Sequence, residues 1–237
     1  MCIRDRFNTL NVKDQSFETE KLSTISNLDF YLDLIGQPFF FPNLFLPHHT
    51  FKRAEMDGVT KVFNGCDGDT VVSHGFEYFE ELFLKLKWLK LYRQIDKLSK
   101  NVNLSKRSIF NRTVLRLLFY EKKLYFSAKN KHKKILSSPL HSNSIEVESL
   151  IADYYGVEEV YPFYNVDLIN YCINVKPCLK INEYPRYILR EAIRDIVPDK
   201  IRKRTDKANL THGVLYSFLN KDKDIIEKHL KNTHEDL

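Results

Sequence analysis

Apolar residues recur along most of this chain at intervals of three and four positions, the spacing that places them on one face of an α-helix. Between them lie mainly lysines and other polar residues, as expected for helices with one solvated face. Pro185 fits a first helical turn, and Pro198 ends the helix before it. The pattern predicts helices over residues 16–35, 48–57, 76–99, 105–126, 144–155, 165–173, 185–196 and 213–230.

A different pattern interrupts the helices at residues 60–63, where β-branched and aromatic side chains predict a short strand. Glycines at 65, 68 and 75 then mark a loop rich in turns. The Ser-, Lys-, Asn- and His-rich segment 127–143 is predicted to be a flexible connection. Together these elements predict an α/β protein that is mostly helical, with one or two strands of a parallel sheet.

The composition favours a folded protein that does not cross a membrane. Hydrophobic residues make up 43% of the 237 residues, enough to bury a core. No run of about 18 apolar residues occurs, because prolines punctuate the most apolar stretch, 34–46. The four cysteines show no C-x-x-C spacing and no paired histidines. This argues against a zinc site or a disulfide framework and predicts a cytoplasmic protein.

Charge is spread unevenly. The net charge is +6, but residues 81–140 carry sixteen basic and three acidic side chains, whereas residues 1–80 and 141–237 are net acidic. Such a basic segment attracts polyanions. Its lysines alternate with apolar residues, however, as on the solvated faces of amphipathic helices. We therefore expect solvated helices and no nucleic-acid partner. A non-catalytic helical module that binds other proteins or a polyanion is the alternative from a different functional class.

The stretch 58–70, Gly-Val-Thr-Lys-Val-Phe-Asn-Gly-Cys-Asp-Gly-Asp-Thr, is the most informative part of the chain. A strand runs into a loop with glycines at i and i+3 and acids at i+2 and i+4. A loop at the carboxyl end of a parallel strand faces the ligand crevice of an open α/β sheet. Glycines allow close approach to a phosphate, and an aspartate holds the Mg²⁺ that accompanies a nucleotide. The plainer interpretation is an ordinary turn.

This loop resembles the G-x-G-[GS]-D-[E] loop of asparagine synthetases and their β-lactam synthetase and lasso-peptide cyclase relatives. Gly65, Gly68 and Asp69 match that motif. The family's second glycine is replaced by Asp67, and the glutamate after the aspartate by Thr70.

Two further stretches follow in the order that the family shows. Residues 156–165 are similar to its G-[LV]-E-x-R-x-P-F-x-D block, with Val160 in place of the arginine and Asn165 in place of the aspartate. Residues 186–207 are similar to its [KR]-x-x-[LI]-R-x-A … [LV]-P-x-x-[IV]-x-x-R-x-[DK]-K signature, which ends at Lys207. Taken singly, these stretches have plainer explanations in core packing and in a solvated basic turn.

The resemblance implies an adenine-nucleotide-hydrolase-like (PP-loop) synthetase domain that uses ATP and Mg²⁺. Such an enzyme activates a carboxylate substrate as an acyl-adenylate, and an amine or ammonia then displaces AMP. The resemblance assigns catalysis to Asp69 and Lys207, the metal to Asp69, and cofactor binding to Gly65, Asp67, Gly68, Asp69 and Lys207. Cys66 stands where asparagine synthetases often have a glutamate, so the general base stays unassigned and the acid and amine stay open.

The resemblance also implies that the domain is incomplete. Residues 1–6 are expected to be a non-native leader and 7–237 a partial synthetase domain, because the family's S-G-G-x-D-S loop does not occur in the chain. We expect the missing part to carry that loop and, for a glutamine-hydrolysing protein, a glutaminase domain. The chain alone is then expected to be inactive and to bind ATP poorly. The Asp69 carboxylate and the Lys207 ammonium are expected within roughly 10 Å of each other.

Overall fold

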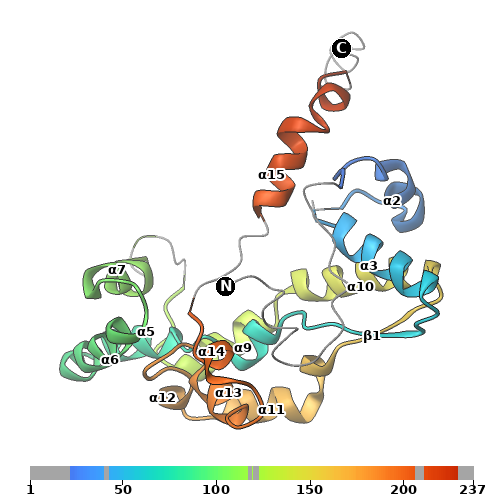
Figure 1. Ribbon diagram of the computed structural model, residues 1–237. Helices are drawn as coiled ribbons and strands as arrows, with labels where there is room; N and C mark the ends of the chain where they lie inside the picture. Colours follow the sequence, from blue (N-terminus) through green and yellow to red (C-terminus); the bar gives the residue numbers. More distant parts are fainter. Residues whose placement is uncertain (1–21, 40–42, 117–118, 120–122, 206–210, 229–237) are drawn as a thin grey trace. The chain divides into compact units, whose positions relative to one another are not determined.

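The computed structural model describes residues 22–39, 43–116, 119, 123–205 and 211–228, which form two compact units (Figure 1). We call residues 65–141 and 161–205 the first unit, and residues 22–64, 142–160 and 211–228 the second unit. The proposed leader 1–6 and Lys207 lie outside the described residues. Among the residues described, no helix is long and apolar enough to cross a membrane.

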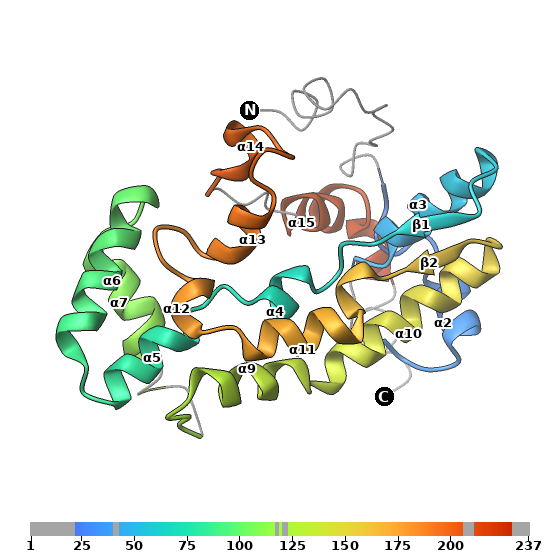
Figure 2. The same ribbon diagram turned by 90° about the horizontal axis from the view of Figure 1, so that it is seen from below.

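The second unit contains the sheet. Strands β1 (Lys61–Phe63) and β2 (Glu158–Val160) pair in parallel, with Lys61 opposite Glu158 and Phe63 opposite Val160 (Figure 2). The helices of this unit are α2 (Leu28–Ile35), α3 (Phe45–Met56), most of α10 (Pro139–Tyr154) and α15 (Thr211–Asn220). Their apolar faces form one core around the buried side chains of Tyr31, Phe51 and Ile151.

The regular elements named in the described part of the first unit are helices. It contains α4 (Gly68–Val72), α5 (Glu77–Leu84), α6 (Trp88–Asn101), α7 (Lys106–Phe110), the π-helical turn η2 (Asn111–Leu115), α9 (Ala128–Leu136), the 3-10 turn η3 (Pro162–Tyr164), α11 (Val166–Asn174), α12 (Pro177–Lys180), α13 (Tyr187–Ala192) and α14 (Asp199–Arg202). One core lies among α5, α6, α7 and η2, and a second lies around Val71 and Cys172. The short helix α4 packs against α9, α11 and η3 (Figure 2).

The predicted mostly helical fold with a small parallel sheet is therefore confirmed, although several predicted boundaries are wrong. The helix predicted over 76–99 breaks into α5 and α6, because Leu86 adopts a left-handed conformation with φ of 56°. The helix predicted over 185–196 extends only from Tyr187 to Ala192, because Arg186 is left-handed with φ of 57°. Pro185 therefore precedes the helix rather than opening it.

The prediction of a flexible connection over 127–143 is wrong. Helix α9 begins after Ser127, whose hydroxyl accepts a hydrogen bond from the Asn130 amide, and α10 begins at Pro139. The polar composition was misleading because two of its polar side chains point inward. Lys131 is buried and pairs with buried Glu80 at 2.5 Å, and His132 is 1% exposed. Paired polar groups of this kind are stable in a core, so composition alone did not identify the helix.

Candidate functional site

The three stretches singled out in the sequence meet in the first unit. Asp69, from the loop that leads into α4, forms an ion pair with Arg186, from the third stretch. The preceding residue in that loop, Gly68, lies against the ring of Phe163, from the second stretch. Parts of the chain about 100 positions apart therefore converge on one short loop, residues 65–70.

The backbone of this loop is turned sharply at Asp67. Asp67 has φ of 53° and ψ of 9°, the left-handed conformation, and it immediately precedes α4. Aspartate is one of the few residues with a side chain that adopt this conformation, because its short carboxylate can bond locally. Here Thr70 donates to Asp67 Oδ1 at 3.3 Å, and the Asp67 carbonyl accepts from the amides of Thr70 and Val71.

The other oxygen of the Asp67 carboxylate points into the unit rather than towards solvent. His141 Nδ1 lies 2.8 Å from Oδ2, and the Tyr164 hydroxyl donates to the same atom. Burial, reinforced by this bond to Asp67, raises the pKa of Tyr164 and keeps its hydroxyl protonated as a donor. His141 Nε2 lies 3.2 Å from the carbonyl of Ile135. In this arrangement Asp67 holds the loop in place.

The two glycines of the motif have different surroundings. A Cβ on Gly68 would lie 2.7 Å from the ring of Phe163, closer than real side-chain atoms approach one another. Gly68 is therefore required by its packing against Phe163. A Cβ on Gly65 would meet no atom within 4 Å, so space remains open beside that position. The Gly68 amide donates to the Gly65 carbonyl at 3.4 Å, which closes the loop on itself.

Asp69 is the most accessible carboxylate of the loop, with 42% of its side chain exposed. Its Oδ1 pairs with Arg186, and its Oδ2 lies 3.6 Å from His74 Nε2. Magnesium in nucleotide sites is held by one or two carboxylates together with phosphate oxygens and water. A single exposed carboxylate beside an arginine fits a magnesium-bound polyphosphate, since the arginine suits the phosphates. In the part of the chain that the structure describes, no group of three metal-binding side chains occurs.

Two buried basic side chains, His132 and Lys180, hold the loop through a hydrogen bond to its Thr70 carbonyl. His132 Nε2 lies 2.8 Å from the Thr70 carbonyl and donates to it, which leaves Nδ1 as the acceptor from Lys180 Nζ at 2.8 Å. Both side chains are buried, and burial lowers the pKa of each. The pair anchors Thr70, which directly follows Asp69 in the first turn of α4.

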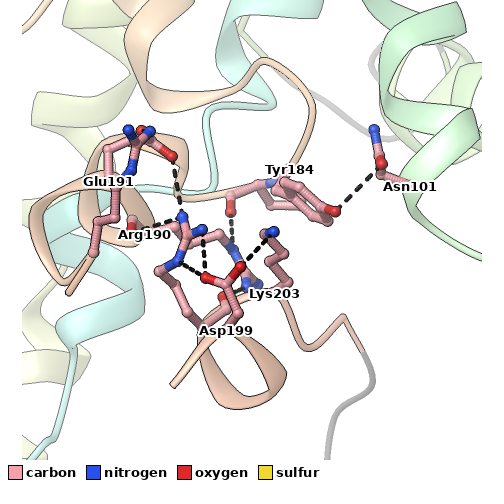
Figure 3. A network of polar contacts seen from close by, with 9 residues as sticks. Asn101, Tyr184, Arg190, Glu191, Asp199 and Lys203 are labelled. Atoms are coloured by element: carbon pink, nitrogen blue, oxygen red, sulfur yellow. Dashed lines mark hydrogen bonds and ion pairs between the residues drawn. The ribbon is translucent and has the colours of Figure 1, made fainter. Parts of the chain in front are cut away.

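The third stretch is folded around Arg190, as Figure 3 shows. The guanidinium of Arg190 donates to the carbonyls of Pro185, Arg202 and Arg204, and so ties α13 to the turn after α14. Arg202 in turn donates to Asp199 at 2.8 Å and to Glu191 at 3.2 Å. These basic residues are therefore not merely a solvated turn, because they organise the segment that carries Arg186.

The sequence analysis singled out Asp67, Gly68 and Asp69. The structure places them beside further residues that the sequence analysis did not identify. Arg186 belongs to the third stretch, but the sequence analysis assigned no role to it and named Lys207 as the catalytic cation of that stretch. Lys207 lies outside the described residues. His141 fell in the segment wrongly predicted to be a connection. His74 lies only five positions after Asp69, and this nearness in sequence is a signal that could have identified it.

Comparison with known protein families gives a match that spans this site. A family model described as "Asparagine synthase" matches residues 7–237, nearly the whole chain. The match includes the loop, the second stretch and the third stretch. Comparison with curated proteins gave no match, and neither did comparison with solved structures.

Proposed function

Because this chain belongs to the asparagine synthase family, we propose that it forms an amide bond at the expense of ATP, through an acyl-adenylate. Family membership implies a ligase-type enzyme and makes ATP the expected nucleotide. The observation that carries the proposal is the ion pair between Asp69 and Arg186. It joins the two motif stretches that should face the phosphates, on the exposed side of the loop.

The proposed reaction has two steps. A carboxylate oxygen of the substrate attacks the α-phosphorus of ATP, and the bond to the β-phosphate oxygen breaks, which releases pyrophosphate. An amine or ammonia nitrogen then attacks the acyl carbon, and AMP leaves as the nitrogen gives up a proton. In the first step negative charge develops on the departing pyrophosphate. Groups fixed in advance where that charge develops therefore lower the barrier.

The residues of the loop and of the third stretch have separate roles in this reaction. Asp69 would hold the magnesium ion, which supplies charge neutralisation to the phosphates. Arg186, already beside Asp69, would turn the N–H groups on one edge of its guanidinium to the pyrophosphate oxygens, with Lys207 as a second cation. Gly65, with open space beside it, gives the backbone room to approach a phosphate, and Gly68 lets the loop pack closely against Phe163. Asp67 contributes to nucleotide binding by holding the loop through His141 and Tyr164.

The same proposal extends to the architecture. We propose that residues 7–237 are a partial adenine-nucleotide-hydrolase-like (PP-loop) synthetase domain, which in the full-length protein works in the cytoplasm with glutamine as the ammonia source. The parallel pair β1–β2 and the loop that directly follows β1 in the chain support this assignment.

The test uses protein expressed from its complete reading frame, with ATP, Mg²⁺, ammonium and aspartate as the probe acid. Conversion of ATP to AMP and pyrophosphate should require the acid. Asp69→Asn and Lys207→Ala should each lower that rate by about 10²–10³. Asp167→Asn removes one exposed carboxylate on α11 and serves as the matched control. Wild-type rates in both variants would contradict the proposal, as would a wild-type protein that forms no AMP with aspartate or a panel of other acids.

A further inference from the structure

The apolar face of α6 is wider than the core that it contacts. Leu91, Ile95 and Leu98 are buried in the core of the first unit. Trp88 and Tyr92 continue the same stripe at helical spacing, yet they are 55% and 60% exposed. The adjoining Leu89 is 77% exposed. Isolated apolar side chains on a surface are ordinary, but a contiguous patch of aromatic and aliphatic residues marks an interaction site.

This exposed patch forms one wall of a groove. Between α6 and α7 lies a cavity of about 470 Å³, with Leu91 and Ile95 at its base and Phe110 on its opposite side. The α6 side of the groove extends from Trp88 to Ile95, two helical turns or about 10 Å. These dimensions suit a few side chains that project from one face of a short helix.

The rim of the groove is cationic. Lys106 and Arg107, the first residues of α7, line it directly. Lys106 Nζ lies 5.0 Å from the centre of the Tyr92 ring and 3.2 Å from its hydroxyl, and it also pairs with Asp96. Further basic side chains on α6, Lys90 and Arg93, are exposed nearby in sequence. An apolar base within a basic rim is complementary to an acidic segment that carries apolar anchors.

We propose that the groove between α6 and α7 is a docking site for an acidic amphipathic helix of a partner protein. The partner's apolar side chains lie along Trp88, Leu91 and Tyr92, and its carboxylates face Arg107 and Lys106. This site is separate from the loop at 65–70 and is independent of the ATP chemistry proposed there. It also gives a role to the basic segment 81–140, which that chemistry leaves unused.

The concave shape favours a peptide over other anionic partners. A membrane surface is flat and would contact the projecting side chains but leave the base of the groove empty. Nucleic acid is held mainly by phosphate contacts and does not require an apolar base such as that formed by Leu91 and Ile95. The experiment therefore includes a single-stranded nucleic acid and a lipid vesicle as competing ligands.

Trp88 provides a direct measurement, because it is the single tryptophan of the 237-residue chain and lines the groove. The probe is a synthetic peptide of glutamate and leucine, about 16 residues long so that it can form a helix, with leucines at i, i+3, i+4 and i+7. Its binding should bury Trp88 and shift the tryptophan emission to shorter wavelength. A peptide of the same composition with scattered leucines, and one with lysine in place of glutamate, should bind at least about tenfold more weakly.

Two variants test the groove itself, and each has a matched control. Leu89→Asp places a charge on the apolar wall, and Arg107→Glu reverses a charge of the rim. Each should weaken peptide binding about tenfold. Ile196→Asp makes the same type of change at a position that is 73% exposed elsewhere in the first unit, and Lys134→Glu reverses an exposed charge on α9. These controls should bind as the wild type does. Circular dichroism shows whether each variant is folded. If Leu89→Asp does not fold, the peptide affinity of Arg107→Glu alone tests the proposed groove.

Four results would overturn the proposal. One is equal affinity for the lysine peptide, and another is full affinity in Arg107→Glu. A third is a shift of the Trp88 emission by oligothymidylate or by phosphatidylglycerol vesicles but not by the acidic peptide, which would assign the groove to nucleic acid or to a membrane. The last is a dimer in sedimentation that Leu89→Asp converts to a monomer, which would show that a second copy of the chain covers the groove.

Discussion

The carboxylate of Asp69 and the guanidinium of Arg186 form an ion pair, although they are 117 positions apart in the chain. Arg186 adopts a left-handed conformation immediately before α13, and Asp69 lies one residue inside α4. Each backbone is thus held in place by its own segment, by Arg190 on one side and by Asp67 on the other. The pair is preorganised, which is what a site for a departing polyanion requires.

Arg186 should therefore be needed for the reaction as a cation with a specific shape. We expect Arg186→Met to lower the rate of AMP formation by about 10²–10³, because one of the two cations proposed to face the pyrophosphate is lost and Lys207 alone remains. Arg186→Lys should recover part of that rate, since it keeps the charge but loses the planar fork. Arg194→Met, which removes an exposed arginine that follows α13 and pairs with Glu191, is the control. Equal rates in Arg186→Met and Arg194→Met would rule out this role.

Gly68 should be intolerant of a side chain, whereas Gly65 should accept one. In Gly68→Ala the new methyl group meets the Phe163 ring, and overpacking of this kind costs about 1–3 kcal/mol in the free energy of unfolding. Gly65→Ala meets nothing within 4 Å and should be close to neutral. Urea denaturation of the two variants compares the costs directly. Adding Phe163→Leu to Gly68→Ala should relieve the loss. Equal stability of the two alanine variants would show that the Phe163 contact is unimportant.

His48 should make the second unit less stable in mild acid. Burial, with the positive charges of His49 and Lys52, lowers the pKa of His48 to about 4 from its ordinary value of 6.5. The folded form therefore resists protonation, while the unfolded chain takes up a proton below pH 6.5. The stability linked to His48 is complete above pH 6.5 and is lost as the pH falls towards 4.

Between pH 7 and pH 5 this linkage should cost about 2 kcal/mol. Urea denaturation followed at both pH values measures it. His48→Leu removes the titrating group, so its stability should change less than that of the wild type over the same interval. His49 also has a pKa lowered by burial and stays in both proteins, so the difference isolates His48. An identical pH dependence in His48→Leu would contradict the expectation.

Asp222 should be the main polar anchor of the second unit's carboxyl-terminal segment. Its buried carboxylate accepts hydrogen bonds from Ser217, from the hydroxyl of Ser23 at 2.5 Å, and from the amide and hydroxyl of Thr24 at 2.9 and 2.6 Å. Burial alone would raise the pKa of Asp222, but these hydrogen bonds outweigh it and lower the pKa.

We expect Asp222→Ala to cost about 1–3 kcal/mol or more, because several buried donors lose their acceptor. Asp224→Ala removes an exposed carboxylate two positions away and should have little effect. Hydrogen exchange of the Thr24 amide reports the loss locally. Unchanged protection of that amide in Asp222→Ala would refute the anchor. Since the folded pKa is lowered, this contribution is present above the unfolded pKa of about 3.9 and disappears in stronger acid.

The family, the helical character and the loop at 65–70 could all be predicted from the amino-acid sequence. Helical periodicity depends only on local spacing, so most helices were predicted, and a motif keeps its residue types because its chemistry needs them. Asp69 and Gly68 could therefore be singled out. The local pattern did not predict the helix boundaries at Leu86 and Arg186, because each boundary depends on one backbone angle. The left-handed conformations of these residues are set by packing.

Which side chains contact one another depends on the three-dimensional fold. The Arg186 partner of Asp69, the Phe163 ring against Gly68 and the inward-facing His141 and His132 all depend on contacts between distant segments. The same holds for the polar helix α9, whose composition predicted a loop. A buried lysine or histidine is stable only once its partner is in place, and that partner is chosen by the fold rather than by neighbours in sequence.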